Sequence, residues 1–504
     1  MINNEATTSS TEKLVSALIF ILVVFIFSYR CWIRSNYSLW LDETLTYWAI
    51  DGDLWTIITR TYRWMGQSPF YFVVLKILTF LFGTSEPALR FISMLSIVGT
   101  AFFIYKIAEE WFDKKSAQLA LLFFLCNPET TFFATNARPY AIGLFFLTAS
   151  VWFLALFIKF KRSLWLVLWI LSTTLTVYSH YLFAGIVVVH LIYIFLSRNR
   201  IRDKIHFLLL STLSIALLLL PILPQFYFLQ FHKFKSFAEM PTIFDLPRAW
   251  ARNFTVLILL AIFTGKLLFM CIKGRAMRKP DPNNIDKLYV ALSWWLLPAF
   301  LVYSISIFLN CSIFVGNYCF WQVPGQAICM ARLSIYLFKG VLRYLVILLA
   351  VLLSCITNWH NRMEHEDWRE AARLINNQLQ LNPSTPVLFS SGHTETQYLS
   401  FLVDPERKDI MLSPLHYYPL ISPVVLLPFR SDSYETRDYL NEELEKLASE
   451  EEILLLIPNL APDYLEFLHN YFKARNYVFK NLANDVRLEG IEAGLFSKDK
   501  SKDN

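Results

Sequence analysis

The sequence predicts an α-helical polytopic membrane protein that ends in a small α/β domain. The 504 residues are 55% hydrophobic and only 17% charged, whereas soluble chains are about 45–50% apolar and about 25% charged. Several apolar runs reach the roughly 20 residues that a helix needs to cross a bilayer. Residues 361–504 instead alternate short apolar strands with helical patterns, which is typical of an α/β layer with a partly parallel sheet.

Charge divides the chain at the same point. Residues 1–360 carry a net charge of +15, and residues 361–504 carry −9. We therefore expect a disordered N-terminus over residues 1–12, a transmembrane domain over 13–357 and a soluble extracytoplasmic domain over 358–504.

Basic clusters stay on the cytoplasmic side of a membrane, and here successive clusters are separated by enough apolar sequence for two crossings. The run Phe70–Phe82 is short for a span, so we expect Asp51–Arg63 and Pro69–Phe82 to lie along the outer surface. The other runs predict about 11 spans, with residues after 358 outside. These spans are 13–32, 88–108, 116–136, 140–158, 163–180, 182–197, 206–224, 253–272, 288–309, 318–338 and 341–357.

Strands and helices can also be placed in the C-terminal domain. The expected strands are Val387–Ser390, Val424–Leu427, Ile453–Ile457 and Ile491–Phe496. The expected helices are Trp368–Leu379, Glu395–Leu402, Tyr434–Leu447 and Tyr464–Arg475. The domain shows no Gly-rich phosphate loop and no nucleophile elbow.

Two adjacent carboxylates, Asp42 and Glu43, follow the first span at the outer membrane surface. Charged groups at membrane depth are costly and usually face a cavity or pair with one another. A carboxylate shielded from water can act as a general base, so Asp42 and Glu43 are the candidate catalytic residues. The alternatives are a helix-capping or interfacial acid for Asp42 and a supporting role for Glu43.

The same face collects residues that suit a phosphate. Arg138 and Tyr140 lie near the end of the third span, His180 ends the fifth, and Arg63 lies on the surface segment. Arginine offers phosphate a planar, permanently charged fork. A carboxylate base with such an arginine, half in lipid, suits a lipid-phosphate sugar donor. The alternatives are a snorkelling Arg138, a hydrogen-bonded His180 and an Arg63 that binds lipid head groups.

Four stretches of the chain resemble the GT-C glycosyltransferases, namely Leu39–Glu43, Ser68–Gly83, Leu89–Ser93 and Ala137–Tyr140. The most similar type is the RgtA/B/C/D-like branch, which is related to dolichyl-phosphate-mannose protein mannosyltransferases and to the lipid A aminoarabinose transferase. The tail that starts at Glu366–Arg369 also resembles the extracytoplasmic domain of that branch. Relatives commonly place a His before the proline of Gln67-Ser68-Pro69, and an Arg-Tyr pair where this chain has Asn317-Tyr318.

The resemblance implies a polyprenyl-phosphate-linked sugar donor, an acidic catalytic residue in the first outer loop and surface helices in that loop. The expected enzyme is a hexosyl- or pentosyltransferase that inverts the sugar and uses a cell-envelope lipid, glycan or protein acceptor. We expect it in a bacterial inner membrane, with its active site on the periplasmic side and no nucleic-acid partner. Some relatives use a divalent metal, for which Asp42, Glu43 and Glu129 would be the oxygen ligands of Mg²⁺ or Mn²⁺.

Two other functions remain open at this point. A transporter or lipid flippase would also concentrate charge in the membrane, but it predicts inverted repeats and paired helix breaks. The sequence shows one such break, at Pro324-Gly325, and no repeat. The other alternative is an oligosaccharide ligase or polymerase that moves whole glycans.

Overall fold

The computed structural model describes residues 2–225, 239–273, 282–360, 366–430, 433–459, 462–483 and 488–499. The chain divides into two compact units. Unit 1 comprises Met1–Ser35 and Thr61–His360, and unit 2 comprises Asn36–Arg60 and Asn361–Asn504. The segment that carries Asp42 therefore belongs to the same compact unit as the C-terminal residues, although the whole of Thr61–His360 lies between them in the sequence.

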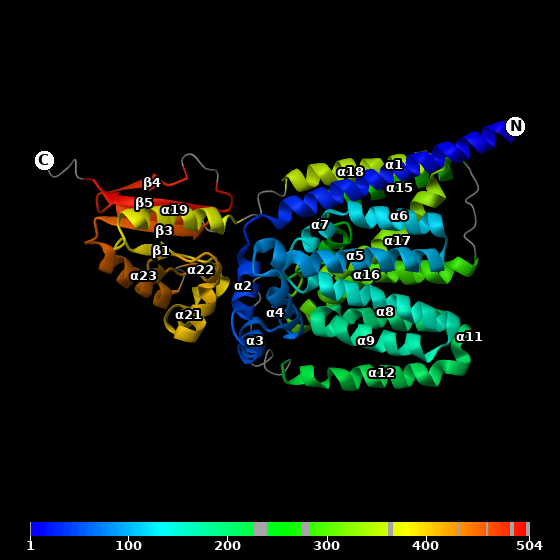
Figure 1. Cartoon of the computed structure of the whole chain (residues 1–504), viewed down its shortest axis with the longest axis horizontal. Helices are drawn as coiled ribbons and strands as arrows, with labels where there is room; N and C mark the ends of the chain where they lie inside the picture. The colour runs from blue at the N-terminus through cyan, green and yellow to red at the C-terminus, as the bar shows by residue number, and fades with distance from the viewer. Residues whose placement is uncertain are drawn as a thin grey trace. The chain divides into compact units, whose positions relative to one another are not determined.

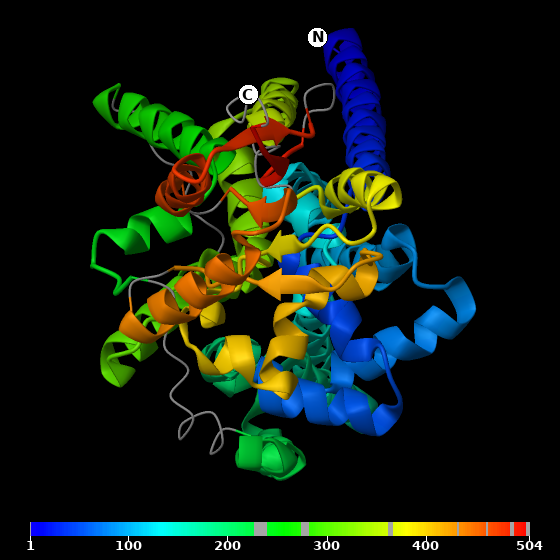
Figure 2. The same ribbon diagram turned by 90° about the vertical axis from the view of Figure 1, so that its left-hand side faces the viewer.

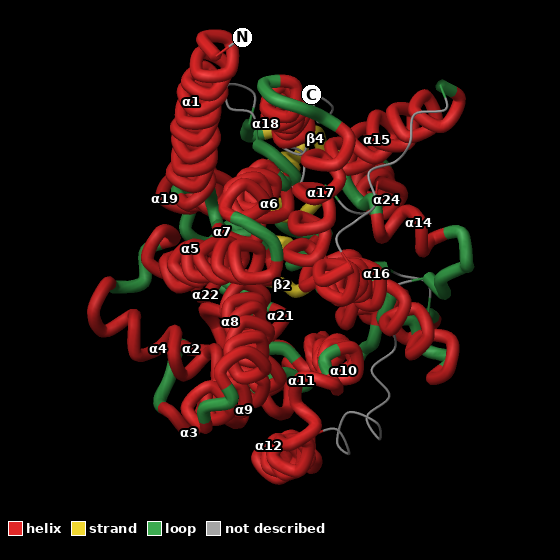
Figure 3. The backbone as a smooth tube through the Cα atoms, turned by 90° about the vertical axis from the view of Figure 1, so that its right-hand side faces the viewer, coloured by secondary structure: helices red, strands yellow, loops and turns green. Residues whose placement is uncertain are grey.

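Unit 1 is built from helices that run alongside one another (Figure 1). Viewed along the helices, α8 lies between α5 and α9, and α12 packs on α9 (Figure 3). The longer helices are α1 (Ile2–Ser35), α4 (Phe70–Phe82), α5 (Glu86–Trp111), α6 (Lys114–Cys126), α8 (Tyr140–Phe160), α9 (Ser163–Ser179), α10 (Ile186–Leu196), α12 (Ile205–Leu219), α15 (Phe254–Ile272), α16 (Pro282–Leu309), α17 (Val323–Leu337) and α18 (Leu342–His360). The shorter elements are the π-helical turn η1 (Thr61–Met65), α7 (Pro128–Ala134), η2 (Tyr181–Gly185), α11 (Arg198–Ile201), η3 (Arg202–Lys204), η4 (Leu220–Ile222), α14 (Asp245–Trp250) and η5 (Gly316–Gln322).

Among the described residues, six helices are long and apolar enough to cross a membrane by length and composition. The number is seven if the pair Tyr181–Leu196 and Arg198–Lys204, bent by 78°, counts as one span. The protein is therefore a multi-pass membrane protein. Other expected spans are shorter or divided, so the count of about 11 stays a prediction. Helix α1 begins at Ile2 and so includes residues 2–12, for which we expected disorder.

Local sequence explains where two expected spans are divided. The run 116–136 becomes α6 and α7, because Asn127 accepts a hydrogen bond from the Glu129 N–H and Pro128 occupies the first turn of α7. Proline is favoured there because its missing N–H has no partner in a first helical turn. The run 318–338 begins as the 3₁₀-helix η5 and becomes α-helical only at Val323. Helix α4 has 13 residues, as expected, and ends at Gly83 with φ +76°.

Unit 2 contains a five-stranded sheet in the order β2-β1-β3-β5-β4, whose strands are coloured from yellow to red in Figure 2. Its strands are β1 (Val387–Phe389), β2 (Val424–Leu426), β3 (Glu452–Pro458), β4 (Tyr477–Asn481) and β5 (Ile491–Lys498). Strand β1 pairs in parallel with β2 and β3, whereas β5 pairs antiparallel with β3 and β4. The partly parallel sheet is confirmed, and β4 is a strand that the sequence analysis did not predict.

The helices of unit 2 pack on the sheet through alternate residues of its strands. Leu455 of β3 belongs to the core that includes Leu444 of α23 and Leu468 of α24. On β1, Phe389 lies against Trp368 of α19, with ring centroids 5.8 Å apart. The helices of this unit are α2 (Leu41–Ile50), α3 (Leu54–Arg60), α19 (Trp368–Leu381), η7 (Thr394–Gln397), α20 (Ser400–Val403), α21 (Pro405–Met411), α22 (Ser413–Tyr417), α23 (Tyr434–Leu447) and α24 (Pro462–Lys473).

Candidate functional site

Both candidate catalytic carboxylates lie in the first turn of α2, in unit 2. Asp42 is half-buried, and Glu43 is fully buried. The Glu43 carboxylate accepts a hydrogen bond from the Trp40 N–H at 3.3 Å, so it caps α2, in whose first turn Asp42 lies. Negative charge is favourable at a helix N-terminus. Glu43 therefore stabilises the start of α2, and the catalytic roles of Asp42 and Glu43 stay predictions.

Helix α2 is attached to the C-terminal part of unit 2 through Asp409. The Trp48 indole donates to Asp409 at 2.7 Å, His416 Nε2 lies 3.0 Å from the other carboxylate oxygen, and Arg60 forms an ion pair at 3.7 Å. The hydrogen bond with His416, followed by that from Trp48 and the charge of Arg60, lowers the pKa of Asp409. The ring of Tyr47 also packs edge-on against a tyrosine of α22.

A second attachment lies at the N-terminus of α2. The N–H groups of a first helical turn have no partner within the helix. Here the Leu41 N–H donates to the Glu366 carboxylate at 2.8 Å, and the Trp368 indole donates to the same oxygen at 2.8 Å. Burial, together with the charge of Asp42, raises the pKa of Glu366 to about 7. A carboxyl group of the C-terminal domain is thus next to Asp42.

His393 and Ser413 complete the polar surroundings of α2. The Ser413 hydroxyl lies 3.0 Å from His393 Nε2 and 3.5 Å from the Thr44 hydroxyl. Burial lowers the pKa of His393, against the charges of Glu395 and Asp42. We call Glu366, His393, Asp409 and Ser413 the loop anchor, because they hold the segment 36–60 within unit 2.

The predicted phosphate-binding residues Arg138, Tyr140 and His180 come together in unit 1. Tyr140 and His180 have ring centroids 5.0 Å apart, and the buried guanidinium of Arg138 is near enough to interact electrostatically with the His180 ring. Tyr318, from η5, adds a ring 5.5 Å from His180. We call these four residues the arginine cluster. Arg63 is exposed in η1, and its donor contact stays a prediction.

Buried polar atoms without hydrogen bonds occur in and around the arginine cluster. Among the described residues, both amide atoms of Asn136, Nδ1 of His180 and Oε1 of Gln67 are buried and make no hydrogen bond. The Gln67 carbonyl accepts from Gln225 at 2.9 Å, and Gln225 in turn bonds to Tyr181, next to His180 in the sequence. Native proteins contain few such buried, unsatisfied groups. Their presence beside a buried arginine is typical of a site for a polar ligand.

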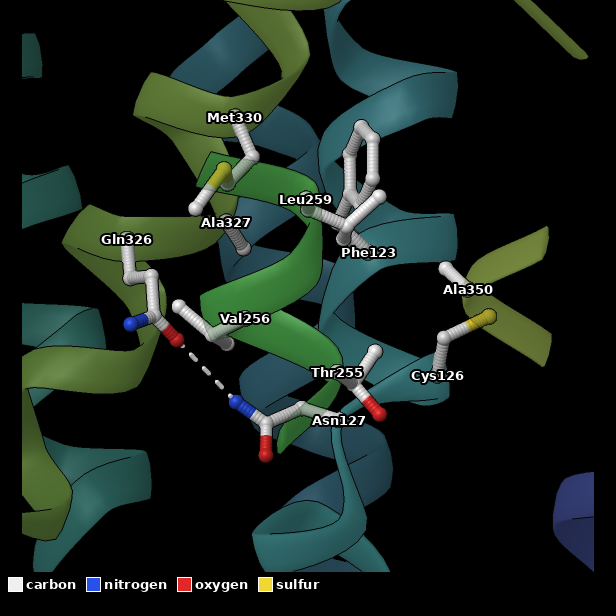
Figure 4. Close-up of a pocket in the computed structure, with 10 residues that line it drawn as sticks. All are labelled: Phe123, Cys126, Asn127, Thr255, Val256, Leu259, Gln326, Ala327, Met330 and Ala350. Atoms are coloured by element: carbon white, nitrogen blue, oxygen red, sulfur yellow. Dashed lines mark hydrogen bonds between the residues drawn. The ribbon is translucent and has the colours of Figure 1, made fainter. Parts of the chain in front are cut away.

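Glu129 lies in the first turn of α7, where its carboxylate faces Arg252 at 3.8 Å. Asn127, two residues before Glu129, also forms side-chain hydrogen bonds. It donates to Gln326 at 3.1 Å (Figure 4) and accepts from Asn253 at 3.2 Å. Glu129 belongs to unit 1, whereas Asp42 and Glu43 belong to unit 2.

Whether Asp42, Glu43 and Glu129 could bind a divalent metal depends on the groups that their carboxylates already contact. Glu43 is bonded to a backbone N–H and Glu129 is paired with a guanidinium. Within the described ranges, no three His, Cys, Asp or Glu side chains are grouped so that they could hold a metal ion. These contacts do not indicate a metal site.

Sequence reasoning missed the residues that come from distant parts of the chain. It named Arg138, Tyr140 and His180 individually, but the addition of Tyr318 depends on tertiary packing. It quoted Glu366 only as part of a tail that resembles the family. A hydrogen bond between Leu41 and Glu366 has no local signature.

Comparison with solved structures finds proteins with a similar architecture. The crystal structure of ArnT from Cupriavidus metallidurans bound to undecaprenyl phosphate matches with a TM-score of 0.53 at 12% sequence identity, covering 95% of this chain and 98% of that one. The apo structure of the same protein matches with a TM-score of 0.55 at 13% identity, covering 94% and 97%. The chain has the fold of ArnT. The GT-C-like fold class expected from the sequence is thereby confirmed.

A family comparison adds a shorter match. Residues 66–224 match the family model described as dolichyl-phosphate-mannose-protein mannosyltransferase. This range contains Arg138, Tyr140 and His180, while Asp42 lies before it. A comparison with curated protein sequences finds no match. The family match thus contains three residues of the arginine cluster, whereas Tyr318 lies outside it.

Proposed function

We propose that this protein is an integral membrane glycosyltransferase that moves a sugar from a polyprenyl-phosphate donor to a cell-envelope lipid, glycan or protein acceptor. The observation that carries the proposal is the ArnT fold over 95% of the chain, since the ArnT crystal structure holds undecaprenyl phosphate. The mannosyltransferase match over residues 66–224 supports it. We place the reaction on the periplasmic side of a bacterial inner membrane, as a hexosyl or pentosyl transfer.

In the proposed reaction Asp42 accepts the proton of the acceptor hydroxyl. The acceptor oxygen then forms a bond with the anomeric carbon, while the bond from that carbon to the phosphate oxygen breaks. Direct displacement inverts the anomeric centre, and polyprenyl phosphate leaves.

The arginine cluster supplies the second half of this chemistry. Arg138 would stabilise the negative charge that grows on the leaving phosphate, because a preorganised charged donor in a water-poor site acts strongly on developing charge. The Asn136 amide and His180 Nδ1, which make no hydrogen bond in the described structure, are suited to donate to phosphate or sugar oxygens. The rings of Tyr140 and Tyr318 flank His180.

The decisive experiment replaces the base. Purified protein is incubated with polyprenyl-phosphate sugars, and release of polyprenyl phosphate is measured. We expect Asp42→Asn to lose roughly 10²- to 10⁴-fold in rate, as is typical for removal of a general base. Asp53→Asn is the matched control, because Asp53 is an exposed carboxylate of the same segment that caps α3 through Thr56.

Two results would overturn the proposal. One is an Asp42→Asn variant that inserts normally and turns over near the wild-type rate. The other is movement of the lipid-linked sugar across a vesicle membrane without cleavage of its phosphate bond, which would indicate a transporter or flippase.

A further inference from the structure

We propose that Glu366 of the C-terminal domain is a positioning residue for Asp42, so that this domain completes the catalytic centre. The inference rests on the proposed function, in which Asp42 is the base. It assigns a role in catalysis to the C-terminal part of unit 2.

The side chain of Glu366 contacts the residue that precedes Asp42. Its Oε2 accepts the Leu41 N–H at 2.8 Å, and Leu41 is the residue that precedes Asp42. The Trp368 indole, which is fully buried, donates to the same oxygen at 2.8 Å and so fixes the carboxyl group. Glu366 is therefore rigidly tied on one side to the domain core and on the other to the first turn of α2.

Charge links Glu366 to the base as well. Like charges that lie close together disfavour ionisation of each other, and the charge of Asp42 contributes to the raised pKa of Glu366, after burial. Because that pKa is about 7, Glu366 is largely neutral below pH 7 and largely ionised above it. Ionised Glu366 and the Asp42 carboxylate repel each other. Ionisation also strengthens both hydrogen bonds, since charged acceptors bind donors more tightly.

Other charged groups near α2 are engaged elsewhere. The Arg369 guanidinium donates to the Asn36 carbonyl at 3.0 Å, and Asp367 caps α19 by accepting from the Glu370 N–H. His393 interacts electrostatically with both Glu395 and Asp42. Burial lowers the pKa of His393 and keeps its ring neutral. Among these described groups, Glu366 is the one whose pKa of about 7 lies near neutral pH.

The variant Glu366→Gln separates charge from structure. Both bonds of Glu366 fall on one oxygen, so the glutamine carbonyl can accept both while the side chain cannot ionise. We expect the wild-type kcat for polyprenyl phosphate release to rise with pH through about 7. In Glu366→Gln this rise should disappear, and kcat at pH 8 should be about tenfold lower, because both hydrogen bonds then have a neutral acceptor in place of a charged one.

Two further variants distinguish positioning from folding. Glu366→Ala loses both hydrogen bonds and should have a lower kcat than Glu366→Gln at every pH. Glu370→Gln is the control, because Glu370 lies in α19, which begins two residues after Glu366, and pairs with Arg373; it should keep the wild-type pH profile. A Glu366→Gln enzyme that retains the rise through pH 7 would contradict the proposal.

Infrared difference spectroscopy of the purified full chain tests the coupling without turnover. We expect a carboxyl band that titrates near pH 7, is absent from Glu366→Gln, and moves to lower pH in Asp42→Asn because the repulsion is removed. An unchanged titration in Asp42→Asn overturns this inference even when sugar transfer is observed. The expected titration in a wild-type protein that releases no polyprenyl phosphate overturns the proposed function instead.

Discussion

The arginine cluster of unit 1 and the loop anchor of unit 2 bury polar groups in opposite ways. In the loop anchor, Glu366 accepts two hydrogen bonds and Asp409 contacts Trp48, His416 and Arg60. Beside the arginine cluster, both amide atoms of Asn136 and Nδ1 of His180 are buried and make no hydrogen bond within the described residues.

This difference is consistent with the two roles proposed above, positioning for the loop anchor and donor binding for the arginine cluster. A buried polar group without a partner costs about 1–3 kcal/mol, so folding stability alone does not favour the Asn136 amide. A ligand with polar oxygens would supply the missing partners. The satisfied groups of the loop anchor need no ligand, and they hold α2 and its Asp42 in one orientation. The comparison therefore predicts different outcomes for variants in the two regions.

The largest effect is expected at Arg138. Arg138→Gln removes the charge that would stabilise the leaving phosphate, and we expect a loss of about 10²- to 10³-fold in kcat, the usual range for a lost charge-stabilising donor. Release of polyprenyl phosphate is the measurement. Arg248→Gln is the control, since Arg248 is exposed on α14 and forms an ion pair with Asp245 of the same helix. Wild-type turnover by Arg138→Gln would remove the arginine cluster from the mechanism.

A stability comparison at two asparagines tests the contrast more sharply. Asn136→Leu replaces an unsatisfied buried amide by an apolar group of similar size, so we expect stability to be unchanged or to rise by about 1–3 kcal/mol while KM for the donor increases. Asn127→Leu should instead destabilise the protein by about 1–3 kcal/mol, because the Asn127 amide bonds to Gln326 and Asn253. Thermal unfolding and donor titration measure both. Equal destabilisation by the two variants would mean that the Asn136 side-chain amide has hydrogen-bond partners in the folded protein.

The smallest effect is expected from acid at the loop anchor. The pKa of Asp409 is lowered in the folded state, so its contribution to stability is present above the unfolded value of about 3.9. It is lost as the pH falls through the lowered pKa. We expect wild type to be more stable than Asp409→Asn at pH 6, and we expect this difference to shrink toward pH 3. Thermal unfolding at each pH is the measurement. A difference that does not depend on pH would exclude ionised Asp409 from the anchor.

Much of the fold could be predicted from local patterns. Long apolar runs located helices such as α5 and α8, and short apolar runs between helical patterns located β1, β2, β3 and β5. Strand β4 was missed because Tyr477–Asn481 has a mixed pattern, and its place is set by pairing with β5. The short length of α4 was read directly from its 13 apolar residues.

The sequence by itself determined the chemical types at the site: a carboxylate pair after the first span, and an arginine, a tyrosine and a histidine at later span ends. Only the tertiary structure decided which of these have partners. Glu43 became a helix cap, Tyr318 joined His180, and Glu366 reached the N-terminus of α2 from the C-terminal domain. The physical reason is that hydrogen bonds and burial depend on residues far apart in the chain, which local composition and spacing do not encode.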